Sequence, residues 1–586
     1  MKYKLYDEEI DESMDTIARI LVSRGIDTEI LEDWSNAEYN PEIAEAWQDL
    51  DNIKEAIDVV KTAIDNEDTI AVVVDSDADG FTSAAIFINY LYELYPEYVK
   101  NKINYYLHEG KQHGLSDMAE LKESLIIVPD GGTNDYKQHK KFNENNQTIL
   151  ILDHHEAPFE SQEENTITVN NQLSDNYENK AFSGAGIVYR FCQAYDAEYN
   201  TEHPIADEFL DLVALGNLSD MMDYRNLETR YYIHKGLQNI HNPFFYYMID
   251  KNNFSIQKRG GINYNSIAWY VTPFINAIVR SGTLEEKILV FESMLQMKAF
   301  EKIPSGKRGH KGEMVPRVEE AVRIVTNVKA RQTKGQDAAM ELIENKIAEE
   351  ALLDNAVILC LLEPGQVEPN LAGLVANKVQ AKYQRPTLVL TKFTQGNNVS
   401  YRGSARNYGK SPVTHFKDVV DGTGLVNYAQ GHQGAYGTEL PEYNVDKFIK
   451  AMNDYYAEAP SEPIYWVDYI WTQGQMFGDI IKEIVYEMFD FWGQEIPESL
   501  VCVENIDVAN CPVQLLSADK NPTLKIRLPN GVDIMKFGSS QEEFDKLSQP
   551  GTLVTIVGTP KVNEWNGNVT SQILIEDYEV KNGWRF

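Results

Sequence analysis

One stretch constrains the fold more than any other: the apolar run Ile70–Val74, which leads directly into Asp75-Ser-Asp-Ala-Asp-Gly80. The run is mostly β-branched, which indicates a strand buried on both faces, as in a parallel sheet covered by helices. In such sheets ligands bind just past the carboxyl ends of the strands, where Asp75, Asp77 and Asp79 would stand. Three carboxylates this close repel one another, so the segment predicts a bound hard divalent cation.

Two other interpretations of the segment compete with a cation site in an α/β sheet. The first is a calcium-binding EF-hand loop, which begins with the same D-x-D-x-D-G pattern. That loop needs a glutamate at its twelfth position and a helix leading into it, whereas Ile86 stands there and a strand leads in. The second, a solvated acidic turn, stays open on this stretch alone.

The composition is that of a water-soluble, multidomain protein. A chain of 586 residues predicts about three or four domains, and 43% hydrophobic with 24% charged residues is ordinary for globular proteins. An acidic N-terminus and the lack of a long apolar run predict neither a secretory signal nor a membrane span. The four cysteines are scattered, which predicts a reducing cytoplasm.

The net charge of −37 argues against a polyanionic partner unless a locally basic path exists. Such a path occurs between Glu301 and Gln336, where nine lysines and arginines face four acidic residues, a local charge of +5. Residues 305–312 are expected to form a flexible basic loop, followed by a long helix to about Leu353. A solvated helix face is the alternative.

Strands and helices alternate after Ile70, which predicts a largely parallel sheet. The expected strands are 70–75, 103–107, 125–128 and 148–152, with a further one near Val169 and a helix over 82–95. Polar residues follow the predicted element ends: Lys111 and His113, then Asp130, then Asp153-His154-His155, then Ser183 before a glycine-rich helix start, and Asp220.

Carboxylates and imidazoles without cysteine suit Mn²⁺ or Mg²⁺ better than structural zinc. With this many ligands, two ions that share a bridging carboxylate are expected. Each group alone can also be explained without a metal, for example as a turn at Asp130-Gly131 or as a hydrogen-bonded loop at the paired histidines. The joint pattern favours a metal centre.

Four motifs of this chain resemble, in order, the four motifs of the DHH phosphoesterase superfamily, and most closely those of the RecJ-like single-strand-specific exonucleases. The four are Asp75–Gly80, Asp130, Asp153-His154-His155 and Asp220. Thr272–Arg280 resembles the family's P-x-I-N-A-x-x-R segment, and Leu371–Val379 the entry into its DHHA1 domain. Arg402–Arg406 and Gly431–Gly437 resemble that domain's two signatures. The chain departs from the pattern at Gln430, Tyr436, Val367–Asn370 and the loop with Lys111 and His113.

The resemblance implies roles for individual residues. The metal set is Asp75, Asp77, Asp79, Asp130, Asp153, His154, His155 and Asp220, in which Asp75, Asp153 and His155 orient ligands or complete the coordination of the second metal ion. Catalysis is assigned to Asp77, Asp79, Asp130, His154, His155, Asp220 and His432. Substrate binding is assigned to Lys111, His113, Ser183, Arg280, Arg402, Ser404, Arg406, Gly431, His432 and Trp565.

Two of these assignments keep an alternative. Arg402 and Arg406 flank the small residues Gly403 and Ser404, which favours phosphate contact over a surface salt bridge. Trp565 precedes a strand in a C-terminal region of five short alternating segments, typical of a single-strand-binding OB-fold. Its ring is expected either to stack on a base or to pack on its own barrel.

The predicted fold class is α/β, with a parallel-sheet DHH domain and a smaller α/β DHHA1 domain joined by a long helix, plus a C-terminal all-β OB-like barrel. The expected domains are a helical cap (1–66), the DHH domain (67–240), a helical connector with the basic loop (241–354), the DHHA1 domain (355–455), an aromatic-rich linker or docking segment (456–495) and the OB-like domain (496–586).

The resemblance implies a metal-dependent exonuclease on single-stranded DNA that releases 5′-mononucleotides, with 5′→3′ polarity, in DNA repair, recombination or replication. It also implies a protein partner, a helicase or a single-strand-binding protein. Two alternatives remain: a DHH phosphodiesterase acting on short oligonucleotides or cyclic dinucleotides, and a non-catalytic scaffold that holds single strands. The OB-like region argues against the first, and the intact carboxylates argue against the second.

Overall fold

The computed structural model describes residues 1–11, 13–110, 112–118, 120–459, 462–517, 520–549 and 551–582. The chain divides into two compact units. The N-terminal unit comprises Arg24–Ala330 and Phe489–Pro497, and the C-terminal unit comprises Met1–Ser23, Arg331–Met488 and Glu498–Phe586. The long helix α15 (Arg317–Glu349), close to the predicted one, contains the boundary between the two.

The N-terminal unit contains a five-stranded, entirely parallel sheet with the order β3-β2-β4-β5-β6. The predicted strands are confirmed, and their bounds are β2 (Ile70–Val74), β3 (Ile103–Leu107), β4 (Leu125–Pro129), β5 (Thr148–Asp153) and β6 (Thr166–Asn170). All five residues of β2 are buried, as its β-branched run predicted. Because all strands run the same way, their carboxyl ends share one edge of the sheet.

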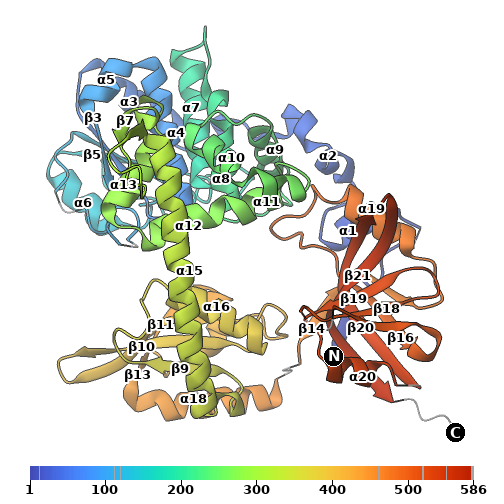
Figure 1. Ribbon diagram of the computed structural model, residues 1–586. Helices are drawn as coiled ribbons and strands as arrows, with labels where there is room; N and C mark the ends of the chain where they lie inside the picture. Colours follow the sequence, from blue (N-terminus) through green and yellow to red (C-terminus); the bar gives the residue numbers. More distant parts are fainter. Residues whose placement is uncertain are drawn as a thin grey trace. The chain divides into compact units, whose positions relative to one another are not determined.

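Helices cover both faces of this sheet (Figure 1). On one face Phe142 of α6 (Tyr136–Glu144) packs with alternate residues of the strands, among them Val73, Val128 and Ile151. On the other side α4 (Ala78–Leu94) packs against α7 (Gly184–Tyr199) and α8 (Leu210–Ser219). Helix α4 begins four residues earlier than predicted because the side chain of Asp77 caps it, accepting from Gly80 N (2.9 Å).

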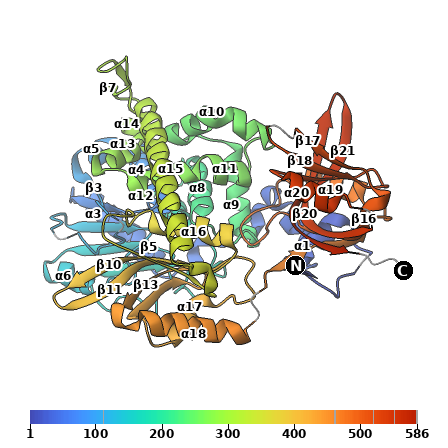
Figure 2. The ribbon, with the colours of Figure 1, turned by 60° about the horizontal axis from the view of Figure 1, so that its bottom comes forward.

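The remaining helices of the N-terminal unit surround this core. They are α2 (Leu31–Ser35), α3 (Ile53–Asp65), α5 (Pro96–Lys102), α9 (Leu227–Gln238), α10 (Pro243–Lys258), α11 (Tyr264–Tyr270), α12 (Thr272–Ser281), α13 (Leu284–Met294) and α14 (Gln296–Ala299). A two-stranded hairpin, β7 (Lys302–Pro304) and β8 (Met314–Pro316), follows α14, and the loop expected over residues 305–312 connects its two strands. Figure 2 shows it projecting beyond α14 at the start of α15.

The C-terminal unit contains a second α/β sheet with the order β12-β13-β11-β10-β9. Only β9 and β10 are parallel. Residues of α15 and α16 (Ala372–Tyr383) pack on one face, and those of α17 (Phe416–Gly422) and α18 (Val445–Glu458) on the other. The strands are β9 (Ile358–Leu362), β10 (Thr387–Gln395), β11 (Asn398–Arg406), β12 (Tyr428–His432) and β13 (Ala435–Pro441).

The C-terminal region forms a seven-stranded, mostly antiparallel sheet with the order β15-β16-β20-β21-β19-β18-β17. The five predicted strands are confirmed as β17 (Val513–Leu516), β18 (Thr523–Arg527), β19 (Asp533–Phe537), β20 (Thr552–Trp565) and β21 (Asn568–Asn582). The structure adds β15 (Tyr469–Thr472), β16 (Val501–Asp507) and the helices α19 (Gly478–Glu487) and α20 (Gln541–Leu547). This region is mostly β, with two helices that were not expected, and it accords with the expected OB-like fold class.

The predicted domain boundaries stay a prediction, but two segments have structure that the sequence did not indicate. The first residues form β1 (Lys2–Leu5), which pairs in parallel with β14 (Ile464–Val467) before α1 (Thr16–Ser23) begins. Residues 489–497 belong to the N-terminal unit, where Phe491 packs against Trp34 with ring centroids 5.7 Å apart. Across the described ranges, no helix is both long enough and apolar enough to cross a membrane.

Candidate metal centre

The segment after β2 places three carboxylates in different surroundings. Asp75 is buried, and its Oδ1 accepts from Gly114 N (2.7 Å), while its Oδ2 lies 2.5 Å from His113 Nδ1. Asp77 caps α4, and Asp79 lies buried in the first turn of that helix. Gly80, in the first turn of α4, allows the helix to pass close to Asp75, because a Cβ there would come within 2.5 Å of the Asp75 Cβ.

Two further carboxylates follow β4 and β5 at the same edge of the sheet. Asp130 is buried and has a left-handed backbone (φ 61°), an uncommon conformation for a residue other than glycine. Its N–H donates to Leu152 O (2.8 Å), which fixes the turn after β4 against β5. Gly184 gives it room, since a Cβ there would lie 2.4 Å from Asp130 Oδ1.

His154 is the imidazole around which the carboxylates gather. Its Nε2 lies 3.1 Å from Asp130 Oδ1, 3.5 Å from Asp220 Oδ2 and 3.9 Å from Asp79 Oδ2. Asp220 comes from the C-terminal end of α8, whose last turn its N–H closes by donating to Gly216 O (3.0 Å). Four predicted metal ligands from four separate segments therefore meet at one point.

The donor atoms form three groups in which all atoms lie within 4.8 Å of one another. The groups are Asp79, His154 and Asp220; Asp130, Asp153, His154 and His155; and Asp75, Asp77 and His113. Every residue of the predicted metal set falls in one of them. His113, which was assigned to substrate binding, lies among these donors instead of apart from them.

The strongest sign that a cation belongs here is a set of buried polar atoms without hydrogen bonds. Both carboxylate oxygens of Asp130 and Nε2 of His154 are buried and have no hydrogen-bond partner among the described residues. Such groups are costly in a protein interior unless another species meets them. Oxygen and imidazole donors in this arrangement fit Mn²⁺ or Mg²⁺, as predicted.

Mutual repulsion also shows in the titration of these groups. Burial, and then the neighbouring Asp79 and Asp77, raise the pKa of Asp130 well above its ordinary value. Burial and the same two carboxylates raise the pKa of Asp220 to about 8. Burial raises the pKa of Asp79 as well, which His154 opposes. The fold therefore holds these carboxylates close together although their negative charges repel one another, and a bound divalent cation would relieve this repulsion.

Asp153 and His155 form a separately satisfied pair beside these groups. Asp153 accepts from Thr133 Oγ1 (2.6 Å), Thr133 N (3.1 Å) and His155 Nδ1 (2.8 Å). Although burial opposes both effects, this contact lowers the pKa of Asp153 and raises the pKa of His155 to about 10. Asn170 Nδ2 donates in turn to Thr133 Oγ1 (3.1 Å), so a chain of hydrogen bonds orients the Asp153 carboxylate.

The glycine-rich start of α7 does approach an anion, but the anion is a carboxylate of the protein. Ser183 Oγ donates to Asp79 Oδ1 (3.0 Å), Gly184 N to Oδ2 (2.7 Å) and Ala185 N to Oδ1 (3.2 Å). The helix N-terminus thus fixes the orientation of Asp79. Gly216 of α8 is needed for this approach, because a Cβ there would lie 2.3 Å from Asp79 Oδ1. Sequence reasoning missed Gly216 and Thr133, which no motif marks.

The remaining predicted residue of the N-terminal unit near this centre is Arg280, in the last turn of α12. Desolvation lowers the pKa of its guanidinium, and the Asp77 carboxylate opposes that shift, which places Arg280 in the electrostatic reach of the acidic groups. Lys111, the other predicted cation, lies outside the described residues.

The predicted residues of the second α/β sheet lie on β11 and β12, the two strands that flank β13 in the C-terminal unit. Arg406 on β11 and His432 on β12 both pair with Ala435 of the intervening strand β13. Ser404 lies two residues before Arg406 on β11, and Gly431 (φ 129°) precedes His432. Arg402 contacts Glu439 (3.1 Å) and stacks on Phe393 (3.6 Å to the centroid), so the salt-bridge alternative is realised for this arginine.

Trp565 ends β20 at the turn into β21, where Asn566 and Gly567 both have positive φ. Its side chain is 71% exposed, so of the two expectations for this ring, packing on its own sheet is not observed.

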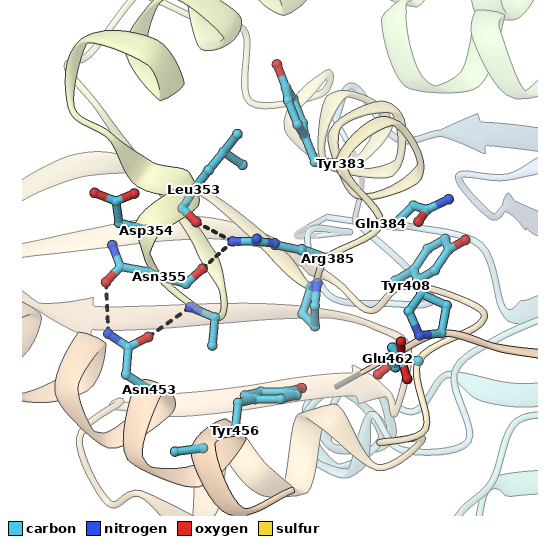
Figure 3. Close-up of a pocket in the computed structure, with 15 residues that line it drawn as sticks. Leu353, Asp354, Asn355, Tyr383, Gln384, Arg385, Tyr408, Asn453, Tyr456 and Glu462 are labelled. Carbon is cyan, nitrogen blue, oxygen red and sulfur yellow. Dashed lines mark hydrogen bonds between the residues drawn. The ribbon is translucent and has the colours of Figure 1, made fainter. Parts of the chain in front are cut away.

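A separate pocket of about 720 Å³ lies in the C-terminal unit and contains none of the predicted residues. Figure 3 shows Arg385 at its centre, donating to the carbonyl oxygens of Leu353 and Asn355, with Tyr383, Tyr408 and Tyr456 around it. The Arg385 guanidinium is already bonded to the backbone, whereas the buried Tyr456 hydroxyl has no hydrogen-bond partner among the described residues, so the pocket offers one such polar atom and no cluster like that of the metal centre.

Comparisons with known proteins define the class. Two family models match: "DHH family, N-terminal domain" at residues 69–217, and "RecJ OB domain" at residues 467–577. The first range contains the sheet and most of the metal centre, and the second contains the seven-stranded sheet from β15 to β21, save its last residues. The chain therefore combines a DHH domain with an OB domain of the RecJ type.

Relatives identify the family more closely. The chain is 34% identical over 99% of its length, and 98% of the relative's, to the "Putative SPbeta prophage-derived single-strand DNA-specific exonuclease YorK" of Bacillus subtilis (strain 168). It is 23% identical to the "Single-stranded-DNA-specific exonuclease RecJ" of the same strain, covering 96% of this chain and 68% of that one. The chain belongs to the RecJ family of DHH proteins, as its motifs predicted.

The fold agrees with that membership. The structure matches the crystal structure of RecJ in complex with Mn²⁺ from Thermus thermophilus with a TM-score of 0.70 at 19% identity, over 96% of this chain and 76% of that one. A second structure from that organism, in complex with Mg²⁺, matches with a TM-score of 0.64 at 18% identity, over 96% and 74% of the two chains.

Proposed function

We propose that this protein is a metal-dependent exonuclease that hydrolyses the phosphodiester bonds of single-stranded DNA. The observation that carries the proposal is the buried group of unpartnered donors at Asp130 and His154, in a chain similar over its whole length to a named single-strand-DNA-specific exonuclease. A scaffold that only held DNA would gain nothing from buried, repelling carboxylates.

Some residues of the metal centre would ligate the cations, and others would orient the ligands. Asp79, Asp130, His154 and Asp220 would hold one cation, and Asp75 and Asp77, with His113 or a shared carboxylate, would hold a second. When bound, the cations supply Lewis-acid activation of water and of the phosphate. Asp153 and His155 orient their neighbours, and the helix start at Ser183 fixes Asp79.

The protein's own cations would act on the substrate phosphate. Arg280 stands near Asp77 in the same unit, where a positive charge stabilises a developing negative one. Arg406, Ser404, Gly431 and His432 form a polar group on β11 and β12 that suits a phosphate backbone. Arg402 would contribute less to phosphate binding, because it already contacts Glu439. The exposed ring of Trp565 is available to stack on a base.

We further infer release of 5′-mononucleotides with 5′→3′ polarity, in DNA repair, recombination or replication, and a cytoplasmic location. These rest on the RecJ family membership. A helicase or a single-strand-binding protein is the expected protein partner on the same ground.

The test is digestion of single strands labelled at either end, with a 5′-phosphate, a 5′-hydroxyl or a blocked 5′ end, with and without Mn²⁺. We expect Mn²⁺-dependent mononucleotide release from the 5′ end of single strands and no digestion of blunt duplex. Release from the 3′ end would overturn the polarity. Digestion confined to di- and trinucleotides or cyclic dinucleotides would replace the exonuclease with a small-substrate phosphodiesterase.

A further inference from the structure

The β7–β8 hairpin (Lys302–Pro316), hereafter the basic hairpin, is a strongly charged feature that the proposed catalysis does not use. Between Lys302 and Gly312 the sequence carries four basic residues and no acidic one, in a chain whose net charge is −37. The four are Lys302, Lys307, Arg308 and Lys311, and all of them are exposed. The hairpin belongs to the N-terminal unit, the same unit as the metal centre.

The basic hairpin is an ordered element because its turn is tied to the following helix. Glu320 of α15 accepts from Gly306 N (2.9 Å) and Ser305 Oγ (3.2 Å), and Arg323 pairs with the same carboxylate. Within the turn, Ser305 N donates to Glu313 O and Gly312 N donates to Ser305 O, each at 2.8 Å. The backbone that carries the lysines is therefore held in place before any ligand arrives, which reduces the entropy that binding would cost.

The charges at the tip are available to a ligand. Among the residues that the structure describes, none of the four basic side chains forms an ion pair, whereas nearby Arg317 contacts Glu292 (2.5 Å) and Glu301 (2.8 Å), and Arg323 contacts Glu320. The two glycines of the tip, Gly309 and Gly312, have positive φ, and a Cβ on either would meet no atom within 4 Å. Their surroundings are open, so a polyanion can approach the backbone closely.

The basic hairpin lies away from the metal centre. Glu301, the residue before β7, lines a cavity of about 530 Å³ together with Val99 and Lys100 of α5 and with residues 103–106 of β3. The metal ligands stand past the carboxyl ends of β2, β4 and β5. The hairpin instead projects beyond α14 (Figure 2), so we expect its tip to meet nucleotides other than the one being cleaved.

We propose that the basic hairpin binds the phosphate backbone of the enzyme's own single-stranded DNA, at nucleotides distant from the end being cleaved. Between Ser305 and Glu313 the only ring is His310, which pairs with Glu313 (3.0 Å), so the tip offers no base-stacking platform. The exposed apolar side chains beside it, Phe300 before β7 and Met314 in β8, are fewer than its basic residues and do not make the buried anchor cluster of a protein interface. Unpaired point charges suit a uniform row of phosphates. A strand held at the metal centre presents its remaining length at high effective concentration, which favours this occupant over any free polyanion.

This inference rests on the proposed function, and its test separates the two. Steady-state digestion would compare a strand of about four nucleotides with one of about 60. An extended single strand spans about twice the 3.4 Å per nucleotide of a duplex, so the short strand is roughly 27 Å long at most and is expected to leave the hairpin empty. For K307A/R308A/K311A we expect KM on the long strand to rise roughly tenfold at low salt, with kcat and all constants on the short strand unchanged.

Binding of the long strand, measured by fluorescence anisotropy in EDTA, gives a readout that does not need catalysis. Losing three contacts to single-stranded phosphates should make the slope of log Kd against log salt concentration shallower by about 2. The charge-matched control is K140A/K447A/K450A, which removes three exposed lysines from α6 and α18 and should behave as wild type.

Each result decides between explanations. A wild-type protein that digests neither strand would contradict the proposed function, and the anisotropy slopes would still test the hairpin. Equal effects of the hairpin and control variants would reduce the finding to net charge and overturn the proposal. So would an effect confined to duplex DNA, or one equally large on the short strand.

Discussion

The metal centre and the basic hairpin both gather charges of one sign, but the metal centre buries its carboxylates and the hairpin exposes its basic side chains. At the metal centre, carboxylates are buried and two oxygens of Asp130 have no hydrogen bond, whereas at the hairpin four basic side chains are exposed and form no ion pair with a described residue. Burial sets the energy scale, because desolvated charges interact far more strongly than solvated ones. We therefore expect large, all-or-none effects at the metal centre and graded, salt-sensitive effects at the hairpin.

The largest expected effect is that of Asp130→Asn on turnover. The amide keeps the size of the side chain and suits its left-handed backbone, but it removes a negative ligand from the centre. Single-strand digestion with saturating Mn²⁺ should fall by about 10³-fold or more, which corresponds to about 4 kcal/mol of transition-state stabilisation. Turnover within a few-fold of wild type would show that Asp130 is not a ligand.

Asp211 provides a control that separates burial from a lack of partners. It is as buried as Asp130, but its Oδ1 accepts from Leu212 N (2.7 Å) and its Oδ2 from His241 N (2.8 Å) and Asn242 N (2.6 Å). Asp211→Asn should therefore leave the Mn²⁺ dependence of digestion unchanged. If this variant lost its metal response as Asp130→Asn does, burial alone would explain both.

The same variant gives a pH dependence with a defined sign. Burial raises the pKa of Asp211 to about 6, against the three backbone donors, which lower it. The folded state therefore binds a proton more tightly than the unfolded state, and the protein loses stability as pH rises from about 4 to about 6. Asparagine removes this loss, so denaturant unfolding should show the variant gaining about 3 kcal/mol relative to wild type between pH 4 and pH 7. A constant difference across that range would contradict the assignment.

An intermediate effect is expected at Thr133, which donates twice to Asp153 and is not itself a predicted metal ligand. Thr133→Val removes the hydroxyl and leaves the shape, so the affinity for Mn²⁺, measured by isothermal titration, should weaken by about 10- to 100-fold. Thr133→Ser keeps the donor and should retain most of the affinity. Equal losses in both variants would point to packing instead of orientation.

The smallest effect is expected from loosening the basic hairpin without changing its charges. Glu320→Ala removes the carboxylate that holds Ser305 and Gly306, so trypsin should cleave after Lys307 and Arg308 faster than in wild type. KM on long strands should rise only about two- to threefold, less than after removal of the three basic side chains, because the charges persist. Unchanged proteolysis would mean that Glu320 does not order the turn.

Sequence reasoning located the metal centre because its signal is local. The apolar run of β2 predicts a buried strand, and the aspartates that follow it in sequence must lie at its carboxyl end. Parallel strands bring Asp130 and Asp153 to the same edge of the sheet. What it missed depends on tertiary contact: the approach of Gly184 to Asp130, of Gly216 to Asp79, and the position of His113 on Asp75. The strands β7, β8, β15 and β16 were missed because they are short or pair with distant segments.

The central claim is that Asp130 and its neighbours repel one another until a cation binds. Thermal unfolding of wild type and Asp130→Asn, each in EDTA and in Mn²⁺, tests it most directly. We predict that the variant is more stable than wild type in EDTA, because one buried charge is gone, and that Mn²⁺ raises the Tm of wild type and of Asp211→Asn far more than that of Asp130→Asn. A variant that is less stable than wild type in EDTA and keeps the full Mn²⁺ response would contradict the account.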